Sequence, residues 1–291
     1  MHPAPSVILF TTLSGLGFGL LAWLGLGLPV VTGWPAFWYF FVGFGLAVAG
    51  LLFSTLHLGR PERAIKAFTQ WRTSWLSREA WMSMAALSVM GLYAIGAIFF
   101  GVRIALLGWI GAALSLATVV TTSMIYAQLK TVPRWNHFST PVLFLVLAIT
   151  GGALLGGYGA LALVLLVLSG GLQLLFWHFG DQRFSARGSS LGTASGLGTI
   201  GAVRQFAPPH TGTSYLTREM VFLLGRKHQK TLRVIGVLLM SILPALLLST
   251  NGGLVALGVC AVLHLLGVLT IRWLFFAQAE HVVGLYYGAH D

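Results

Sequence analysis

The sequence predicts an all-α, polytopic integral membrane protein. Only 8% of the 291 residues are charged, whereas soluble domains carry about 25%, and 57% are hydrophobic. The first 59 residues contain no Lys, Arg, Asp or Glu, and about 20 apolar residues are enough to cross a bilayer. These observations exclude a soluble globular domain. The short alternating strands of a membrane barrel are also absent from the sequence, which leaves helices as the spanning elements.

Glycine- and proline-marked turns divide the apolar runs into eight expected helices, which form one transmembrane domain over residues 1–291. In chain order we expect them at about 6–28, 36–57, 80–101, 104–127, 138–157, 159–179, 232–249 and 254–277. A short turn joins the two helices of each successive pair, as at 27–35, 156–159 and 249–253. Longer segments that contain Lys and Arg separate one pair from the next.

The cations are distributed very unevenly between the two faces of this arrangement. Fifteen of the 17 Lys and Arg follow the second, fourth and sixth helices, so they lie on one face: Arg60, Arg63, Lys66, Arg72, Arg78, Lys130, Arg134, Arg183, Arg187, Arg204, Arg218, Arg226, Lys227, Lys230 and Arg233. The opposite face has Arg103, and Arg272 lies inside the last helix. Short cationic loops stay in the cytoplasm, so we expect this face and both termini to be cytoplasmic, in a bacterial inner membrane. The net charge of +11 then reflects topology, and nucleic acid is not an expected partner.

Two further features limit the chemistry of the chain. The long loop 181–231 is expected to be irregular, without a core of its own, and to pack against a partner subunit. The single Cys260 lies in an apolar stretch, which excludes a disulfide, a cysteine-ligated iron–sulfur cluster within this chain and covalently attached haem. No metal site is expected. A non-covalent haem held by residues such as His264 and His281 is a weaker alternative.

Ionisable residues within the membrane or at its edge are candidates for function, because burying a charged side chain there is costly. His57 ends the second helix, Arg60 and Arg63 follow it, and Ser77-Arg78-Glu79 opens the third. A histidine and a carboxylate at one interface suit proton-coupled redox chemistry on a quinone, whose two-electron reduction consumes two protons. The alternative is structural: Glu79 would only complement the helix N-terminus behind a Ser77 cap, and His57 would only sit at the interface.

Several motifs resemble the membrane-anchor family of dimethyl sulfoxide reductase. They are His57-Leu58-Gly59-Arg60-Pro61-x-Arg63-Ala64, Trp71-Arg72-x-Ser74-x-Leu76-Ser77-x-Glu79, Thr131-Val132-Pro133-x-Trp135 and Thr140-Pro141. The resemblance implies an anchor without haem that exchanges electrons between membrane quinone and a four-cluster iron–sulfur subunit, itself connected to a molybdopterin catalytic subunit. It also implies that His57 and Glu79 match the family's quinone-site histidine and acidic residue.

The predicted orientation separates this chain from the reductase anchor, whose catalytic partners are periplasmic. A cytoplasmic partner face, together with the segment from Pro208 to Met220, looks like the anchor of the cytoplasmic sulfite dehydrogenase, a branch of the same family. That resemblance implies oxidation of sulfite and reduction of a quinone, either ubiquinone or menaquinone. A quinol-oxidising anchor of a reductase-like complex remains an alternative, as do a transporter and a purely structural tether.

The remaining candidate residues surround the same interface. Arg60, Arg63 and Arg272 would stabilise negative charge on the reduced quinone, and Ser77 would line the site. Tyr126 and Trp135 either wall the quinone pocket or belong, with Trp71 and Trp81, to an interfacial aromatic belt.

A partial repeat in the sequence suggests a duplicated unit. Ser77-Arg78-Glu79 before the third helix resembles Thr217-Arg218-Glu219, which we expect to open the seventh. Duplication of a four-helix unit would give two parallel repeats, because an even number of helices preserves orientation.

Overall fold

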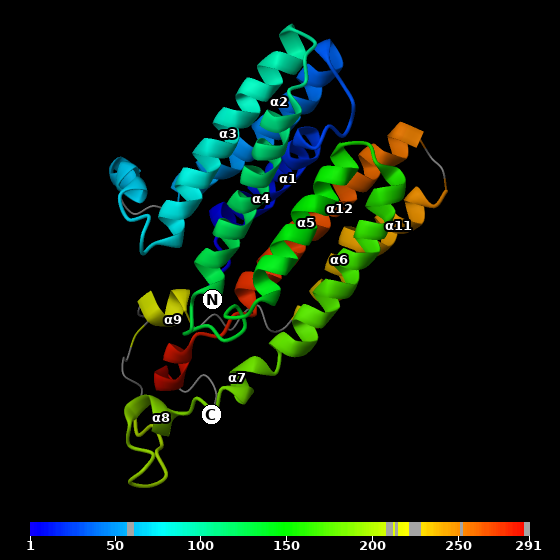
Figure 1. The fold of residues 1–291 in the computed structure, drawn as a ribbon. Coiled ribbons are helices and arrows are strands. Elements are labelled where there is room, and N and C mark those ends of the chain that lie inside the picture. Colours follow the sequence, from blue (N-terminus) through cyan, green and yellow to red (C-terminus); the bar gives the residue numbers. More distant parts are fainter. Residues whose placement is uncertain (57–60, 208–211, 213–214, 221–227, 251–252, 288–291) are drawn as a thin grey trace.

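The computed structural model describes residues 1–56, 61–207, 212, 215–220, 228–250 and 253–287, and these residues form helices and no strand (Figure 1). Seven of the long helices are α1 (Pro5–Gly25), α2 (Gly33–Thr55), α3 (Trp75–Phe99), α4 (Ala105–Ala127), α5 (Ser139–Leu155), α6 (Gly159–Gly180) and α12 (Gly253–Ala277). The eighth runs without a break through α10 (Gln229–Val237), η3 (Leu238–Ile242) and α11 (Leu243–Leu248). Each of the eight expected spans is therefore occupied by a helix.

Seven of the described helices are long and apolar enough to cross a membrane. The fifth, α5, is apolar but has only 17 residues, at the lower end of the usual range for a span. The protein is thus a multi-pass membrane protein, and the crossing of the bilayer by α5 remains a prediction.

The start of α3 differs most from the expected boundaries. The helix begins at Trp75, five residues before the predicted start, with Ser74 at the N-cap position. Arg78 stays in the first turns because its guanidinium donates to the Trp71 carbonyl at 3.0 Å and stacks over the Trp75 ring. Glu79 stays there because it is buried against α4. From their charge alone, both residues are expected to precede the span.

Helix α1 lies at the centre of the molecule and packs against α2, α4 and α5. Small residues allow this close approach, as in other membrane helix pairs. A Cβ at Gly19 would overlap the backbone of Ala148 in α5, and one at Gly17 would overlap Ala47 in α2. The interior of the bundle is therefore set by backbone-to-backbone contacts along α1.

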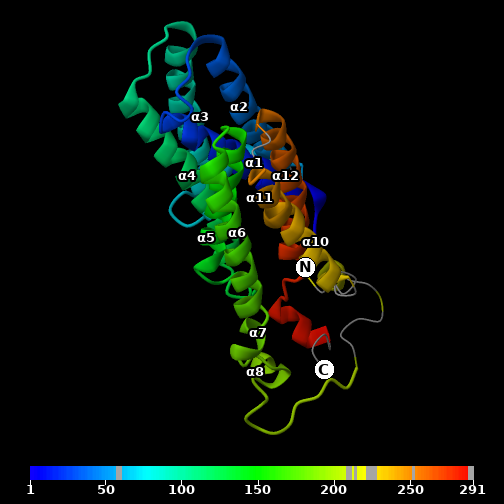
Figure 2. The same ribbon diagram turned by 90° about the vertical axis from the view of Figure 1, so that its right-hand side faces the viewer.

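The long helices form two groups of four, α1–α4 and α5, α6, α10–α11 and α12 (Figures 1 and 2). In each group the first helix packs against the second and the fourth, and the third packs against its two neighbours in sequence. This shared packing order is what the predicted parallel duplication requires. The tripeptide Thr217-Arg218-Glu219, however, does not occupy the position that Ser77-Arg78-Glu79 has at the start of α3. Glu219 ends the separate helix α9 (Tyr215–Glu219), ten residues before α10 begins.

The loop between α6 and α10 contains short helices, which corrects the expectation of a wholly irregular segment. They are α7 (Arg183–Ala186), α8 (Leu191–Ser195) and α9. A reciprocal capping box between Ser190 and Thr193 starts α8, as in longer helices. The loop also contacts η4 (Val282–Tyr287), since Tyr286 donates its hydroxyl to the Ala194 carbonyl at 2.5 Å. The short η1 (Pro61–Phe68) precedes α3.

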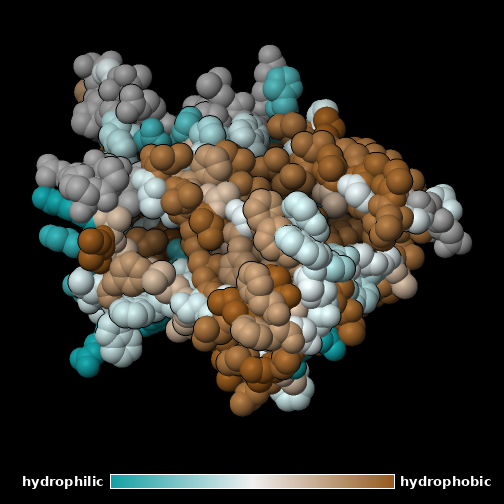
Figure 3. Space-filling model, turned by 90° about the horizontal axis from the view of Figure 1, so that it is seen from above, coloured by the Kyte–Doolittle hydropathy of each residue, from teal (hydrophilic) through white to brown (hydrophobic). Residues whose placement is uncertain are grey.

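The cationic loops, η1 and the N-terminus lie at one end of the helices (Figure 1). The Met1 ammonium group donates to the Ala279 carbonyl, just after α12, at 2.7 Å. Seen from the opposite end, the surface is dominated by hydrophobic residues, with hydrophilic ones mostly along the margin (Figure 3). This separation matches a membrane protein with one polar, loop-rich face.

Candidate functional site

Glu79 is buried between α3 and α4, close to the loop-rich face. Its side chain is 4% exposed and accepts a hydrogen bond from the Thr122 hydroxyl. No Lys, Arg or His in the described part of the chain forms an ion pair with it. A buried carboxyl group without a cationic partner is costly unless it is hydrogen-bonded or protonated, and the Thr122 hydroxyl supplies such a hydrogen bond to Glu79.

The structure contradicts the alternative in which Glu79 complements the N-terminus of α3 behind a Ser77 cap. Ser74, rather than Ser77, occupies the N-cap position of α3, so Ser77 lies within the helix. The Glu79 carboxylate bonds to Thr122 of the neighbouring helix. Ser77 is buried too, but residues two apart on a helix point in different directions, and it does not share the face of Glu79.

Arg272 is the second buried ionisable group of this region. Its side chain is 2% exposed, and its Cζ lies 3.4 Å from the centre of the Phe144 ring of α5. Its Nε and Nη1 have no hydrogen-bond partner among the described residues. As expected for an intramembrane cation, Arg272 faces protein, and the negative face of the Phe144 ring attracts its guanidinium.

Arg272 borders two small cavities of about 10 Å³ each, and both are also lined by hydroxyl-bearing residues. Thr11 of α1 lines both cavities, Ser14 and Thr122 line the first, and Thr12 lines the second. A cavity of this size holds about one water molecule. Thr122 therefore connects the two ionisable groups, since its hydroxyl contacts Glu79 and its side chain faces a cavity beside Arg272.

Two aromatic residues complete the cluster. Tyr126 of α4 lies within electrostatic range of both Glu79 and Arg272. The Trp135 ring packs edge-on against Tyr126 at 5.4 Å, stacks on Phe275 at 5.1 Å and donates its indole N–H to the Phe275 carbonyl at 3.0 Å. Trp135 is 2% exposed. It therefore belongs to the core and not to an aromatic belt at the lipid surface.

The structure thus brings together four of the predicted site residues, Glu79, Tyr126, Trp135 and Arg272, at the loop-rich ends of α3, α4 and α12. Arg63 lies apart from them, exposed on η1. His57 and Arg60 are outside the described residues. Sequence reasoning missed Thr122. The run Thr121-Thr122-Ser123 inside an otherwise apolar helix was the signal for a polar neighbour at the depth of Glu79.

An ionic network holds the loop-rich end of α6. Asp181, directly after α6, accepts hydrogen bonds from Arg134 at 2.7 Å and from Arg233 at 2.6 and 2.7 Å. Burial opposes ionisation of Asp181, but these hydrogen bonds outweigh it and keep its pKa below the usual value. The network therefore joins the segment before α5, the end of α6 and the start of α10, and its role is structural.

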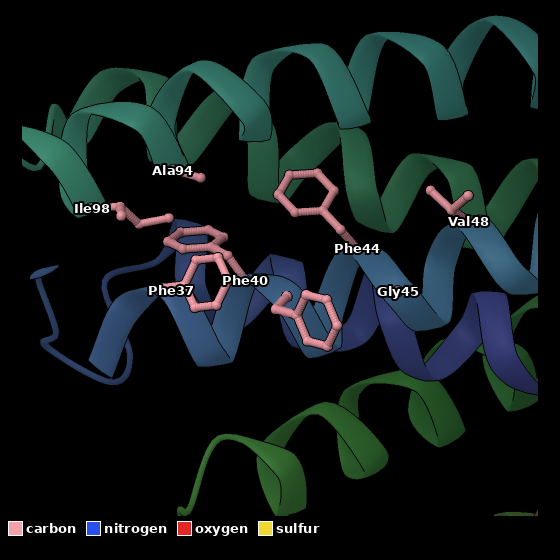
Figure 4. Close-up of a pocket in the computed structure, with 8 residues that line it drawn as sticks. Phe37, Phe40, Phe44, Gly45, Val48, Ala94 and Ile98 are labelled. Carbon is pink, nitrogen blue, oxygen red and sulfur yellow. The ribbon is translucent and has the colours of Figure 1, made fainter. Parts of the chain in front are cut away.

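An apolar pocket of about 370 Å³ lies at the other end of the molecule, between α2 and α3. Phe37, Phe40, Phe44 and Val48 of α2 line it together with Ala94 and Ile98 of α3 (Figure 4). Its lining is hydrocarbon, so it suits a lipid or isoprenoid chain and not a polar headgroup.

Comparisons with known proteins place these features in a family. A family model described as DMSO reductase anchor subunit (DmsC) matches residues 35–177. The chain is 34% identical to a sulfite dehydrogenase subunit of Allochromatium vinosum, in an alignment that covers 99% of each chain. No solved structure matches. Because the similarity extends over nearly the whole chain, the protein belongs to the DMSO reductase anchor subunit family, and it is the membrane anchor of an oxidoreductase that works with catalytic subunits.

Proposed function

We propose that this protein is the quinone-reactive anchor of a sulfite:quinone oxidoreductase in the bacterial inner membrane. The observation that carries the proposal is the buried, hydrogen-bonded carboxyl group of Glu79 at the loop-rich membrane interface. The similarity to a sulfite dehydrogenase subunit supports sulfite as the electron donor of the complex.

The partners bind at the cationic face. A four-cluster iron–sulfur subunit docks on the loops 58–78, 128–137 and 181–231, and a molybdopterin subunit oxidises sulfite. The positive charges of this face orient the partner during association. The metal centres belong to these partners, so the contribution of this chain is to bind quinone and move protons.

The balance of the reaction explains why a protonatable group is needed. Sulfite and water give sulfate, two protons and two electrons, and the quinone takes up two electrons and two protons to become quinol. His57 donates a hydrogen bond to one quinone carbonyl and delivers a proton. Glu79 supplies a proton from the cytoplasmic side. Release and uptake of protons on the same side make the overall step electroneutral.

The other cluster residues act at different distances from the quinone. Arg60 and Arg63 stabilise negative charge on the reduced quinone, and Tyr126 lies within electrostatic range of Glu79. The cavities beside Arg272 are far smaller than a quinone ring, so Arg272 contributes positive charge from within the protein. Such pre-oriented charge acts strongly in a poorly hydrated site. The apolar pocket between α2 and α3 suits the isoprenoid chain.

Two substitutions test this proposal in the assembled complex. We expect His57→Ala and Glu79→Gln to lower quinone-linked sulfite oxidation by at least about 100-fold, the usual contribution of a general acid or base. Sulfite oxidation with an artificial soluble acceptor should remain unchanged, because it bypasses this chain. Glu280→Gln, a carboxylate at the same face but outside the cluster, is the matched control.

Three outcomes would contradict the proposal. Full quinone-linked activity in both variants would exclude the site. Loss of both activities through disassembly of the complex would make the two residues structural. Quinol-dependent reduction of a sulfoxide, without oxidation of sulfite, would favour the reductase alternative.

A further inference from the structure

A second polar site lies at the loop-rich ends of α5 and α6, outside the Glu79 cluster. It is a pocket of about 630 Å³, lined by the segment before α5, the end of α6 and the helix α7 that follows α6. We call it the basic pocket. It is lined by Pro133, Asn136, His137, Phe138, Phe179, Gln182, Arg183, Ala186 and Arg187.

The basic pocket contains positive charge without a matching acid. Arg183 and Arg187 both line it, and none of its described lining residues is a carboxylate. The neighbouring Asp181 is already engaged by Arg134 and Arg233. A pair of guanidinium groups in this situation favours an anionic ligand with several oxygen atoms, because arginine pairs with phosphate through parallel hydrogen bonds.

The protein holds both arginines in place before any ligand arrives. Arg183 donates to the Arg134 carbonyl at 3.0 Å and to Nδ1 of His137 at 2.8 Å, while Arg187 donates to the Lys130 carbonyl. Each guanidinium has five N–H groups, so donors remain for a ligand. Orientation before binding lowers the entropy that association would otherwise cost.

His137 adds a neutral donor to the basic pocket. Its Nδ1 accepts hydrogen bonds from Arg183 and, at 3.1 Å, from the Ser139 backbone N–H. Burial and the charge of Arg183 lower the pKa of His137. The neutral ring then carries its proton on Nε2, where it acts as a donor.

The rim of the basic pocket has the chemistry of a membrane interface. Phe138, at the start of α5, is 73% exposed, and Phe179, at the end of α6, is 53% exposed. Leu174 and Leu175, one turn deeper on α6, are exposed as well. Arginines beside exposed aromatic and aliphatic side chains at the ends of membrane helices match a headgroup and its acyl chains.

We propose that the basic pocket binds an anionic phospholipid, with the phosphate between Arg183 and Arg187 and the acyl chains against the exposed side of α6. The ligand is a lipid and not free phosphate, because the polar pocket continues into an apolar surface. A neutral quinone would leave both guanidinium charges uncompensated. The basic pocket belongs to the loops 128–137 and 181–231 on which we propose that the iron–sulfur subunit docks, so the lipid lies at the edge of that interface, where α6 faces the membrane. It takes no part in the quinone chemistry proposed for Glu79.

The test uses the assembled complex, stripped of lipid in a neutral detergent and titrated with phosphatidylglycerol or phosphatidylcholine while bound lipid is counted by native mass spectrometry. We expect phosphatidylglycerol to be retained in preference to phosphatidylcholine. The double variant Arg183→Gln/Arg187→Gln should bind it at least about tenfold more weakly, since it loses the charge-assisted hydrogen bonds between the guanidinium groups and the phosphate. Arg72→Gln, an exposed cation at the same face but outside the pocket, should bind normally.

Each contrary result has a definite meaning. Equal retention of the two lipids, or unchanged affinity in the double variant, would overturn the proposal. Displacement of phosphatidylglycerol by millimolar inorganic phosphate would make the pocket a free phosphate site and overturn the lipid assignment. If the double variant fails to assemble, Arg187→Gln alone decides the question, because Arg187 is exposed and its side-chain hydrogen bond within the described part of the chain goes to a backbone carbonyl.

Discussion

At the scale of single residues, Thr122 has the clearest unassigned role. It is the hydrogen-bond donor to the proposed proton-transfer group Glu79, and it borders the cavity beside Arg272. It does not contact the quinone in our proposal, so it is a positioning residue. Within the described part of the chain, the neighbouring Thr121 hydroxyl bonds to carbonyls of its own helix, Ala117 and Thr118. Thr122 also bonds to the Thr118 carbonyl but adds the bond to Glu79, so Thr121 is the matched comparison.

We expect Thr122→Val to lower quinone-linked turnover about tenfold, because it removes a hydrogen bond to a buried carboxyl group and keeps the side-chain shape. Thr122→Ser should restore most of the rate, and Thr121→Val should leave it unchanged. The measurement is the pH profile of quinone-linked sulfite oxidation for the three variants, alongside activity with a soluble acceptor. If the Thr122→Val enzyme has the wild-type pH profile, Thr122 has no part in the mechanism.

At the scale of elements, the helix from Gln229 to Leu248 shows how a proline shapes a buried contact. Pro244 has no N–H, so it cannot bond to the carbonyl of Met240 four residues earlier, and the helix contains the π segment Leu238–Ile242 at this point. His264 of α12 supplies the missing donor, with its Nδ1 at 2.7 Å from the Met240 carbonyl. Gly267 permits the approach, since a Cβ there would overlap Met240. This contact explains a fully buried histidine in structural terms.

The pairing of Pro244 with His264 predicts a non-additive effect. His264→Leu should lower the free energy of unfolding by about 1–3 kcal/mol, because it leaves the Met240 carbonyl unpaired inside the protein. Pro244→Ala should recover part of this loss in the His264→Leu background, since alanine restores the N–H within the helix. Denaturation of the purified protein in mixed micelles, carried out on the four proteins of the double-mutant cycle, measures the coupling. Additive losses would show that the histidine and the proline act independently.

At the scale of the whole molecule, the uneven distribution of cations predicts the orientation. Fifteen of the 17 Lys and Arg follow α2, α4 and α6, either in the connecting segments or in the first turns of α3 and α10, and the opposite face carries Arg103. The packing agrees with this arrangement, because Met1, η1 and the loops before α5 and α10 lie at the same end of the bundle (Figure 1).

A reporter fused after residue 291 should therefore be active in the cytoplasm. A reporter inserted at the turn 156–158 should be exported, and cytosolic and periplasmic reporters at both positions measure the topology. Export of the C-terminal reporter would show that the orientation is the opposite of the predicted one. It would place the catalytic partners outside the cytoplasm, and the sulfite:quinone proposal would then fail together with the predicted direction of proton uptake.

Composition and local pattern were enough to predict the helices and the family. Continuous apolar runs predicted all eight long helices, with most boundaries within a few residues, because a bilayer demands the same length of hydrocarbon in every span. The motifs around Glu79 were sufficient to identify the family, because they are contiguous in the chain. The helix count stayed open at α5, whose 17 residues lie at the limit of the length argument.

Which polar residues meet could be seen only from the packing of the helices. Glu79 and Thr122 are 43 positions apart in the chain, and Arg272 reaches the same interior from the last helix. Helical periodicity says which face of its own helix a side chain shares, but not which face of another helix it will contact. That choice depends on how the small residues of α1 let α2, α4 and α5 approach. For the same reason Trp135, expected at the lipid interface or in a pocket wall, stacks in the core, because its partner Phe275 is 140 residues away.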